Sequence, residues 1–308
     1  LDGLVDLMTE PVVGIAADLK ARHGQAVPLP ELMVGATLEV LGHAMFGRTF
    51  ADDVQTTAER VVHGMQMAER LEHLTLLYAP SEPIVRRLDR WVRTGRVMPP
   101  QVRVFQNLLT ELDGWVGGIV NDRRDNPTDT ADLLNLLLGV RDESGDPLPL
   151  QRVRDETFTL LMAGHETTAN GLAWMWWLLS QNPEAYDRLL AEVDEVLDGR
   201  VPTVADLPDL KWTQACFEEA LRYYPPVWII PRKALADDVI GGHHISAGTT
   251  VMMPIRHLHH DPRWWNEPER FDPSRFLPGA ADDRPHRPEL CADGGCARDG
   301  DAGPARTI

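Results

Sequence analysis

The most apolar stretch of the chain, residues 158–179, is interrupted by groups that could do chemistry. Its composition favours a central helix that is buried on most sides. Yet its middle reads Ala163-Gly164-His165-Glu166-Thr167-Thr168, and glycine, a carboxylate and β-branched alcohols are poor choices for a helix interior. The small residues leave room for a flat or bulky group against the backbone. A broken local rule in a core element indicates a functional site, and a kinked helix with a Thr-rich surface face is the alternative.

A second candidate constellation is the pair Glu219 and Arg222, which lie on one face of a helix predicted over residues 212–224. Flanking apolar residues predict that part of this helix is buried. A buried charge needs a close partner, and arginine supports bidentate pairing with a carboxylate better than lysine does. By itself, this spacing is also typical of an exposed surface pair.

The stretch around Glu166 resembles the oxygen-activating helix of the cytochrome P450 family, in which a small residue and a glycine precede an acid and two alcohols. The matching residues are Ala163, Gly164, Glu166, Thr167 and Thr168. The resemblance implies that Glu166 and Thr167 are catalytic and relay protons during oxygen activation. It also implies that Ala163 and Gly164 bind the cofactor, a haem.

The Glu-x-x-Arg pair is followed later in the chain by Pro-Glu-Arg-Phe at 268–271, which precedes Asp272-Pro273-Ser274-Arg275-Phe276. Taken together, these two motifs resemble a pair of motifs of this family. In the family, three such residues form a buried ion network beneath the haem. The matching residues here are Glu219, Arg222 and Arg270. Arg232 matches a position whose guanidinium often reaches a haem propionate, with a solvated strand-end arginine as the alternative.

The cysteines and histidines give a weaker signal. A P450 needs a cysteine thiolate on the haem iron, and Cys291 and Cys296 are the candidates, although neither has the family's glycine-rich motif around it. Cys216 is predicted to be a small buried hydrophobe. The histidines at 257, 259 and 260, of which 257 and 259 would share a face on a strand, lack an acid or cysteine at ligand spacing. They are therefore interpreted as polar surface residues rather than a metal site.

The resemblance implies a haem-thiolate monooxygenase that inserts one oxygen atom of O2 into an apolar small molecule. Its electrons would come from a reductase or a ferredoxin. The alternative is a non-catalytic helical remnant without thiolate-ligated haem. The resemblance covers residues 1–278, as a P450 domain that lacks both ends. Residues 279–308 have no aromatic residue and much Asp, Arg, Gly and Pro, so they are predicted to be a disordered tail. The hypothesis for this abrupt change in sequence is a loss of the reading frame or gene boundary near Gly279.

Composition limits the possible partners and compartment. A formal charge of −17 over 308 residues argues against nucleic acid or an anionic membrane as partner. Three cysteines without finger spacing favour a reducing cytoplasm. Residues 158–179 are long enough to span a bilayer, but His165, Glu166 and Asn170 near the centre argue against a membrane segment.

The elements that must position these residues follow from periodicity and turn signals. We predict a mainly α protein with a small β-region, a partial cytochrome P450 fold. Apolar residues at helical spacing predict helices at 29–50 (with a stop at Phe46-Gly47), 105–124, 132–140, 150–179, 184–197 and 212–224. Short β-rich runs between turn residues predict strands at 227–234, 238–240, 243–245 and 249–254.

Overall fold

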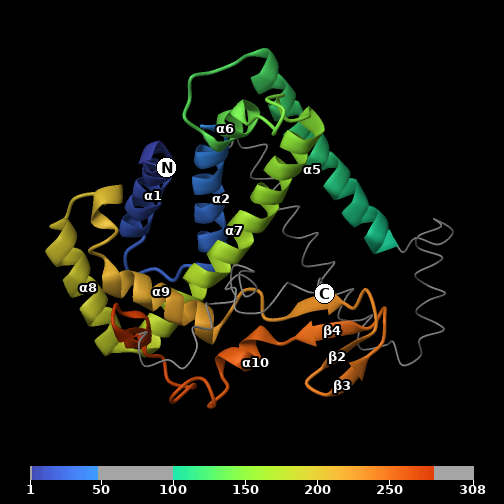
Figure 1. Cartoon of the computed structure of the whole chain (residues 1–308). Coiled ribbons are helices and arrows are strands. Elements are labelled where there is room, and N and C mark those ends of the chain that lie inside the picture. The colour runs from blue at the N-terminus through green and yellow to red at the C-terminus, as the bar shows by residue number, and fades with distance from the viewer. Residues whose placement is uncertain (1, 48–99, 281–308) are drawn as a thin grey trace. The chain divides into compact units, whose positions relative to one another are not determined.

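The computed structural model describes residues 2–47 and 100–280 (Figure 1). Most of the predicted tail lies outside these ranges. The α-helices are α1 (Asp2–Ala21), α2 (Leu29–Phe46), α5 (Pro100–Asp125), α6 (Leu133–Gly139), α7 (Leu150–Gln181), α8 (Pro183–Leu197), α9 (Lys211–Tyr223) and α10 (Ile255–His259). Two 3-10 turns are η1 (Val204–Asp206) and η2 (Pro273–Phe276), and the strands are β1 (Ile230–Lys233), β2 (Asp238–Ile240), β3 (His243–Ile245) and β4 (Thr250–Met253). The predicted mainly α fold with a small β-region is confirmed.

Local sequence signals explain where several helices begin and end. Helix α2 ends at Phe46 because Gly47 adopts φ +66°, a conformation that favours glycine. Pro183 occupies the first turn of α8, where its missing N–H costs nothing. Asp132 caps α6 by accepting a hydrogen bond from the Asn135 amide at 2.8 Å.

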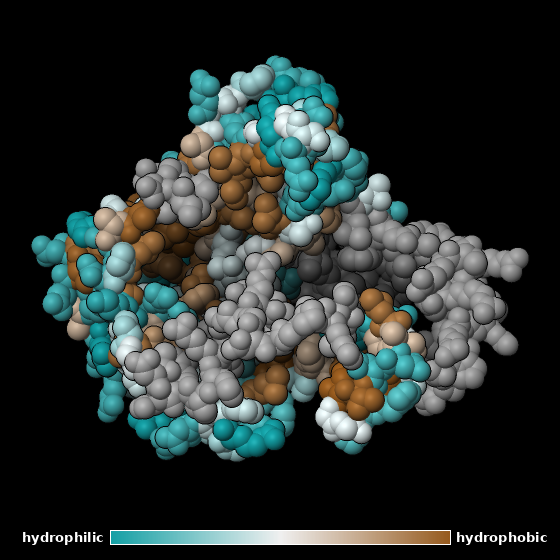
Figure 2. Space-filling view, in the orientation of Figure 1, coloured by the Kyte–Doolittle hydropathy of each residue, from teal (hydrophilic) through white to brown (hydrophobic). Residues whose placement is uncertain are grey.

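The chain divides into two compact units. Unit 1 comprises residues 1–23 and 35–166, and unit 2 comprises residues 24–34 and 167–308. The core of unit 1 is built from apolar side chains of α2, α5, α6 and the first half of α7, among them Met45, Val116, Leu134 and Val153. Figure 2 shows hydrophobic side chains gathered over α2 and this half of α7.

Unit 2 is built around α9, which packs with α8, α10 and η2. Its core includes Leu179, Leu189, Cys216 and Ala220. The β-region consists of two antiparallel pairs, β1 with β4 and β2 with β3. Among the described residues, no helix combines the length and the apolar character needed to cross a membrane.

The burial predicted for the central helix is wrong. Helix α7 is buried along one stripe, with Val153, Leu161 and Ala169 on it, rather than on most sides. Trp174 and Trp177 on this helix are 40% and 44% exposed, and Trp174 stacks on Tyr224. His257 and His259 lie in the short helix α10, and His260 follows it directly.

Candidate functional site

In the described part of unit 2, the buried guanidinium of Arg222 makes five hydrogen bonds. Its Nε donates to Glu219 Oε2 at 2.6 Å and its Nη2 donates to Glu219 Oε1 at 2.9 Å. Both side chains are 0% exposed. They meet because residues three apart in α9 lie on one helix face, and the planar guanidinium matches the carboxylate with two parallel bonds.

The remaining donors of Arg222 bind main-chain carbonyls from three places later in the chain. Nη1 donates to His259 O at 2.7 Å and to Pro268 O at 3.0 Å. Nη2 also donates to Arg270 O at 3.3 Å. All five N–H groups of the guanidinium therefore have acceptors, and one side chain ties α9 to α10 and to the segment 268–270.

Glu219 has partners besides Arg222. Its Oε1 accepts a hydrogen bond from the Asp272 amide at 2.8 Å, and Arg275 Nε lies 3.4 Å from the same oxygen. The Arg275 side chain is only 13% exposed. Its guanidinium also donates to the carbonyls of Asn266 at 2.5 Å and Glu267 at 3.0 Å. Arg275 is thus the second arginine at Glu219.

Arg270, the arginine assigned to this network from sequence, does not reach Glu219. Its side chain is 63% exposed and pairs with Glu267 at 3.2 Å. Only its carbonyl takes part, as an acceptor for Arg222. The physical reason is that η2 carries Arg275 onto α9, whereas the turn at 267–270 points the Arg270 side chain outward. The assignment of Arg270 is corrected to Arg275, a residue that sequence reasoning missed.

The side chains of His259 and Arg222 each hydrogen-bond to the main-chain carbonyl of the other residue. His259 accepts from Arg222 at its carbonyl, and its Nδ1 lies 3.2 Å from Arg222 O, to which an Nδ1–H can donate. The imidazole is 2% exposed, and burial lowers its pKa to about 4. His260 binds Tyr223 O through Nε2 at 2.9 Å, and its side chain is also buried. Both histidines are therefore structural, contrary to the prediction of polar surface residues.

The predicted catalytic pair lies in the middle of α7. Glu166 is half-buried, and Thr167, like Ala163, is exposed. The face of Gly164 is occupied, because a Cβ there would lie 3.4 Å from the Leu41 side chain of α2. The intervening His165 is buried and its carbonyl accepts a hydrogen bond from Thr37 Oγ1 at 3.0 Å. The catalytic role of Glu166 and Thr167 and the cofactor-binding role of Ala163 and Gly164 remain predictions.

Arg232 and Cys216 are not members of the arginine network. Arg232 lies on β1 and is exposed, with its Nη1 donating to Pro231 O at 3.0 Å. Cys216 is fully buried in α9, and burial raises the pKa of its thiol to about 12, which confirms its prediction as a buried hydrophobe. Cys291 and Cys296 lie outside the described residues. Within residues 2–47 and 100–280, no group of three His, Cys, Asp or Glu side chains is placed to hold a metal.

Comparison with known proteins gives a consistent result. The family model of cytochrome P450 matches residues 3–290. Cytochrome P450 132 of Mycobacterium tuberculosis (strain ATCC 25618 / H37Rv) is 43% identical over 296 residues, which cover 96% of this chain and 63% of the relative. Cyclooctat-9-en-7-ol 5-monooxygenase of Streptomyces melanosporofaciens is 35% identical over 85% of this chain and 56% of the relative.

Solved structures agree with the sequence relatives. The crystal structure of the cytochrome P450DA haem domain matches 92% of this chain and 59% of that chain with a TM-score of 0.75 and 26% identity. This chain therefore spans less than two thirds of the length of these relatives. The match over residues 3–290 and the 43% identity across nearly the whole chain decide the family. This protein belongs to the cytochrome P450 family.

Proposed function

We propose that this chain is part of a haem-thiolate monooxygenase that inserts one oxygen atom of O2 into an apolar small molecule and reduces the other to water. The observation that carries the proposal is the buried Glu219–Arg222 pair with Arg275 beside it, in a chain matched to the P450 family over residues 3–290. One relative is named a monooxygenase and another, pentalenene oxygenase, an oxygenase. Two electrons per turnover would come from a reductase or a ferredoxin.

The residues of α7 fit a haem on one face of that helix. Ala163, Glu166 and Thr167 are spaced by three and four residues, so their side chains lie on the same face. The small Ala163 and the alcohol Thr167 are exposed there, which supports the approach of a flat group. At Gly164 the corresponding space belongs to Leu41, so Ala163 is the better candidate for direct contact.

Each of these residues has a distinct proposed role. The haem would supply the redox chemistry when bound. The Glu166 carboxylate would take up a proton from solvent and pass it on. The Thr167 hydroxyl would hydrogen-bond the group that accepts this proton and hold that group in position. Arg232 would pair with a propionate. Glu219, Arg222 and Arg275 would not touch substrate but would fix α9 against η2.

We further propose a cytoplasmic location and no nucleic-acid partner, on the grounds of the formal charge of −17 and the cysteine pattern. The comparisons give no support to the alternative of a non-catalytic remnant.

The proposal is tested by haem titration of the full chain followed by the spectrum of its ferrous-CO complex. We expect the red-shifted Soret band of a thiolate-ligated haem, and we expect Cys291→Ser or Cys296→Ser to abolish it. Cys216→Ala is the matched control and should leave the band unchanged, because this thiol is buried in α9. A ferrous-CO spectrum without thiolate character in the parent chain would overturn the proposal.

A further inference from the structure

A pocket of about 610 Å³ lies entirely within unit 1. It is formed by the end of α5, the loop 127–130, α6, and the turn that leads into α7. This volume is in the range of small-molecule sites. Its lining combines leucine and proline side chains with three arginines, Arg123, Arg124 and Arg141.

Two of these arginines already have carboxylate partners. Arg123 Nη1 donates to the buried Asp132 at 2.6 Å and its Nη2 donates to Phe46 O at 2.9 Å. Arg124 Nε pairs with Asp125 at 2.8 Å. Their charges are therefore largely compensated before any ligand arrives.

Arg141 differs from both. Its Nη1 donates only to the carbonyls of Leu138 and Val140, each at 3.3 Å. In the part of the chain that the structure describes, no carboxylate forms an ion pair with it. The nearest acid in sequence, Asp142, is engaged with the amides of Ser144 and Asp146. The Nε and Nη2 edge of Arg141 thus remains available to an incoming anion.

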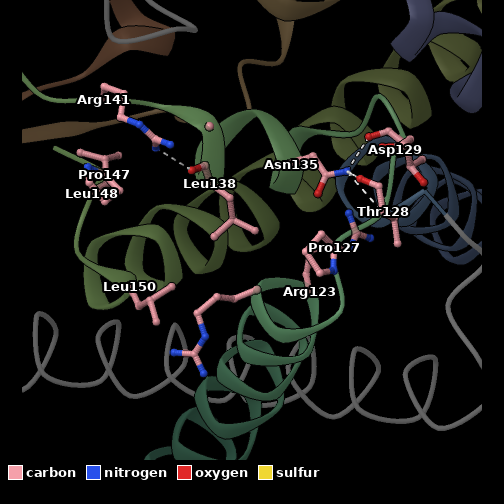
Figure 3. Close-up of a pocket in the computed structure, with 13 residues that line it drawn as sticks. Arg123, Pro127, Thr128, Asp129, Asn135, Leu138, Arg141, Pro147, Leu148 and Leu150 are labelled. Atoms are coloured by element: carbon pink, nitrogen blue, oxygen red, sulfur yellow. Dashed lines mark hydrogen bonds between the residues drawn. The ribbon is translucent and has the colours of Figure 1, made fainter. Parts of the chain in front are cut away.

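The two ends of the pocket carry different side chains. Figure 3 shows Arg141 at one end beside Pro147 and Leu148, with Thr128 and Asp129 at the opposite end. Asp129, the one carboxylate among the lining residues, therefore lies at the end opposite Arg141. Next to the Arg141 guanidinium the wall is apolar and is formed by Pro147 and Leu148.

The Arg141 end is held in place by its own turn. The backbones of Arg141 and Pro147 form an antiparallel bridge, and the Asp142 amide donates to Asp146 O at 2.8 Å. Across the pocket, Asn135 Nδ2 ties α6 to the carbonyls of Thr128 and Thr130 at 2.9 and 2.6 Å. Both ends are preorganised, so little ordering opposes binding.

We propose that this pocket binds a small carboxylic acid with an apolar body, with its carboxylate on Arg141 and its body along Pro147, Leu148 and Leu150. The inference rests on unit 1 alone and is independent of the proposed monooxygenase activity. It makes Arg141 a binding residue.

Isothermal titration calorimetry on the full chain tests this proposal, with decanoate as the probe. Acetate represents its carboxylate alone, and decan-1-ol represents its apolar body without the carboxylate. Decanoate should bind more tightly than either half. Arg141→Gln should weaken decanoate binding about tenfold, because a charge-assisted pair is lost, and should leave decan-1-ol binding unchanged. Circular dichroism should show the same melting curve for both proteins, because Arg141 is exposed.

Arg152→Gln is the matched control. It removes an arginine of unit 1 that is paired with Glu156 at 3.8 Å and does not line the pocket. Decanoate affinity should stay within about twofold of the parent chain, since exposed charges act weakly at a distance. The proposal is overturned if decanoate does not bind, binds no better than decan-1-ol, or responds equally to both substitutions.

Discussion

Replacing Arg222 with methionine is expected to lower the free energy of unfolding by about 3–5 kcal/mol, the usual cost of removing one partner of a buried ion pair. The substitution leaves the Glu219 carboxylate, 0% exposed, without the guanidinium that binds both of its oxygens. It also leaves the carbonyls of His259, Pro268 and Arg270 without this donor. Equilibrium unfolding in urea measures the loss.

Two further variants separate this effect from a general loss of packing. The double variant Glu219→Gln with Arg222→Met should be more stable than Arg222→Met alone, because it no longer buries an uncompensated charge. Arg152→Met removes an exposed arginine of an i,i+4 pair and should cost less than about 1 kcal/mol. If Arg222→Met cost no more than Arg152→Met, the central role of Arg222 would be wrong.

Acidification from about pH 7 to about pH 5 is expected to cost about 2 kcal/mol of unfolding free energy through His259 alone. Burial lowers the pKa of this imidazole from 6.5 to about 4. Between those two values the unfolded chain takes up a proton that the folded chain does not. Stability should therefore fall as the pH falls from about 6.5 and level off below about 4. Urea unfolding at a series of pH values measures this slope.

His259→Asn is the control for this slope. Its side-chain amide can still donate to Arg222 O, as Nδ1–H does in the parent chain, but it does not titrate. The variant should lose the part of the pH dependence that lies between about 4 and 6.5. An unchanged slope in His259→Asn would assign the dependence to other groups.

Helix and strand positions were largely predictable because local signals decide them. The helix stop at Phe46-Gly47 appears in the structure where the sequence predicts it, and the helix predicted over 184–197 is α8. The Glu219–Arg222 contact was also predictable, because helix geometry alone places residues three apart on one face.

The third member of the network was not predictable in the same way. The chain contains Pro-x-Arg-Phe twice, at 268–271 and at 273–276, and both copies carry an arginine at the same place. Only the tertiary arrangement distinguishes them, because η2 packs on α9 and directs Arg275 to Glu219. Residue type and spacing could not decide which arginine lies inside.

Side-chain environment along α7 also depends on distant segments. The contact of Leu41 with the face of Gly164 comes from α2, far earlier in the chain, so the sequence of α7 gives no sign of it. Similarly, the exposure of Trp174 and Trp177 reflects what packs on that face rather than their own hydrophobicity. The Arg141 pocket was missed because its walls come from α5, α6 and the start of α7 together.

Glu219 holds two arginines, Arg222 and Arg275, and Arg270 is not one of them. Two double-mutant cycles test it directly, one with Glu219→Gln and Arg275→Met and the other with Glu219→Gln and Arg270→Met. Urea unfolding should give a coupling free energy of about 1 kcal/mol or more for Glu219 with Arg275. For Glu219 with Arg270 it should be near zero, because that side chain is 63% exposed and pairs with Glu267. The reverse order of the two coupling energies would contradict the account.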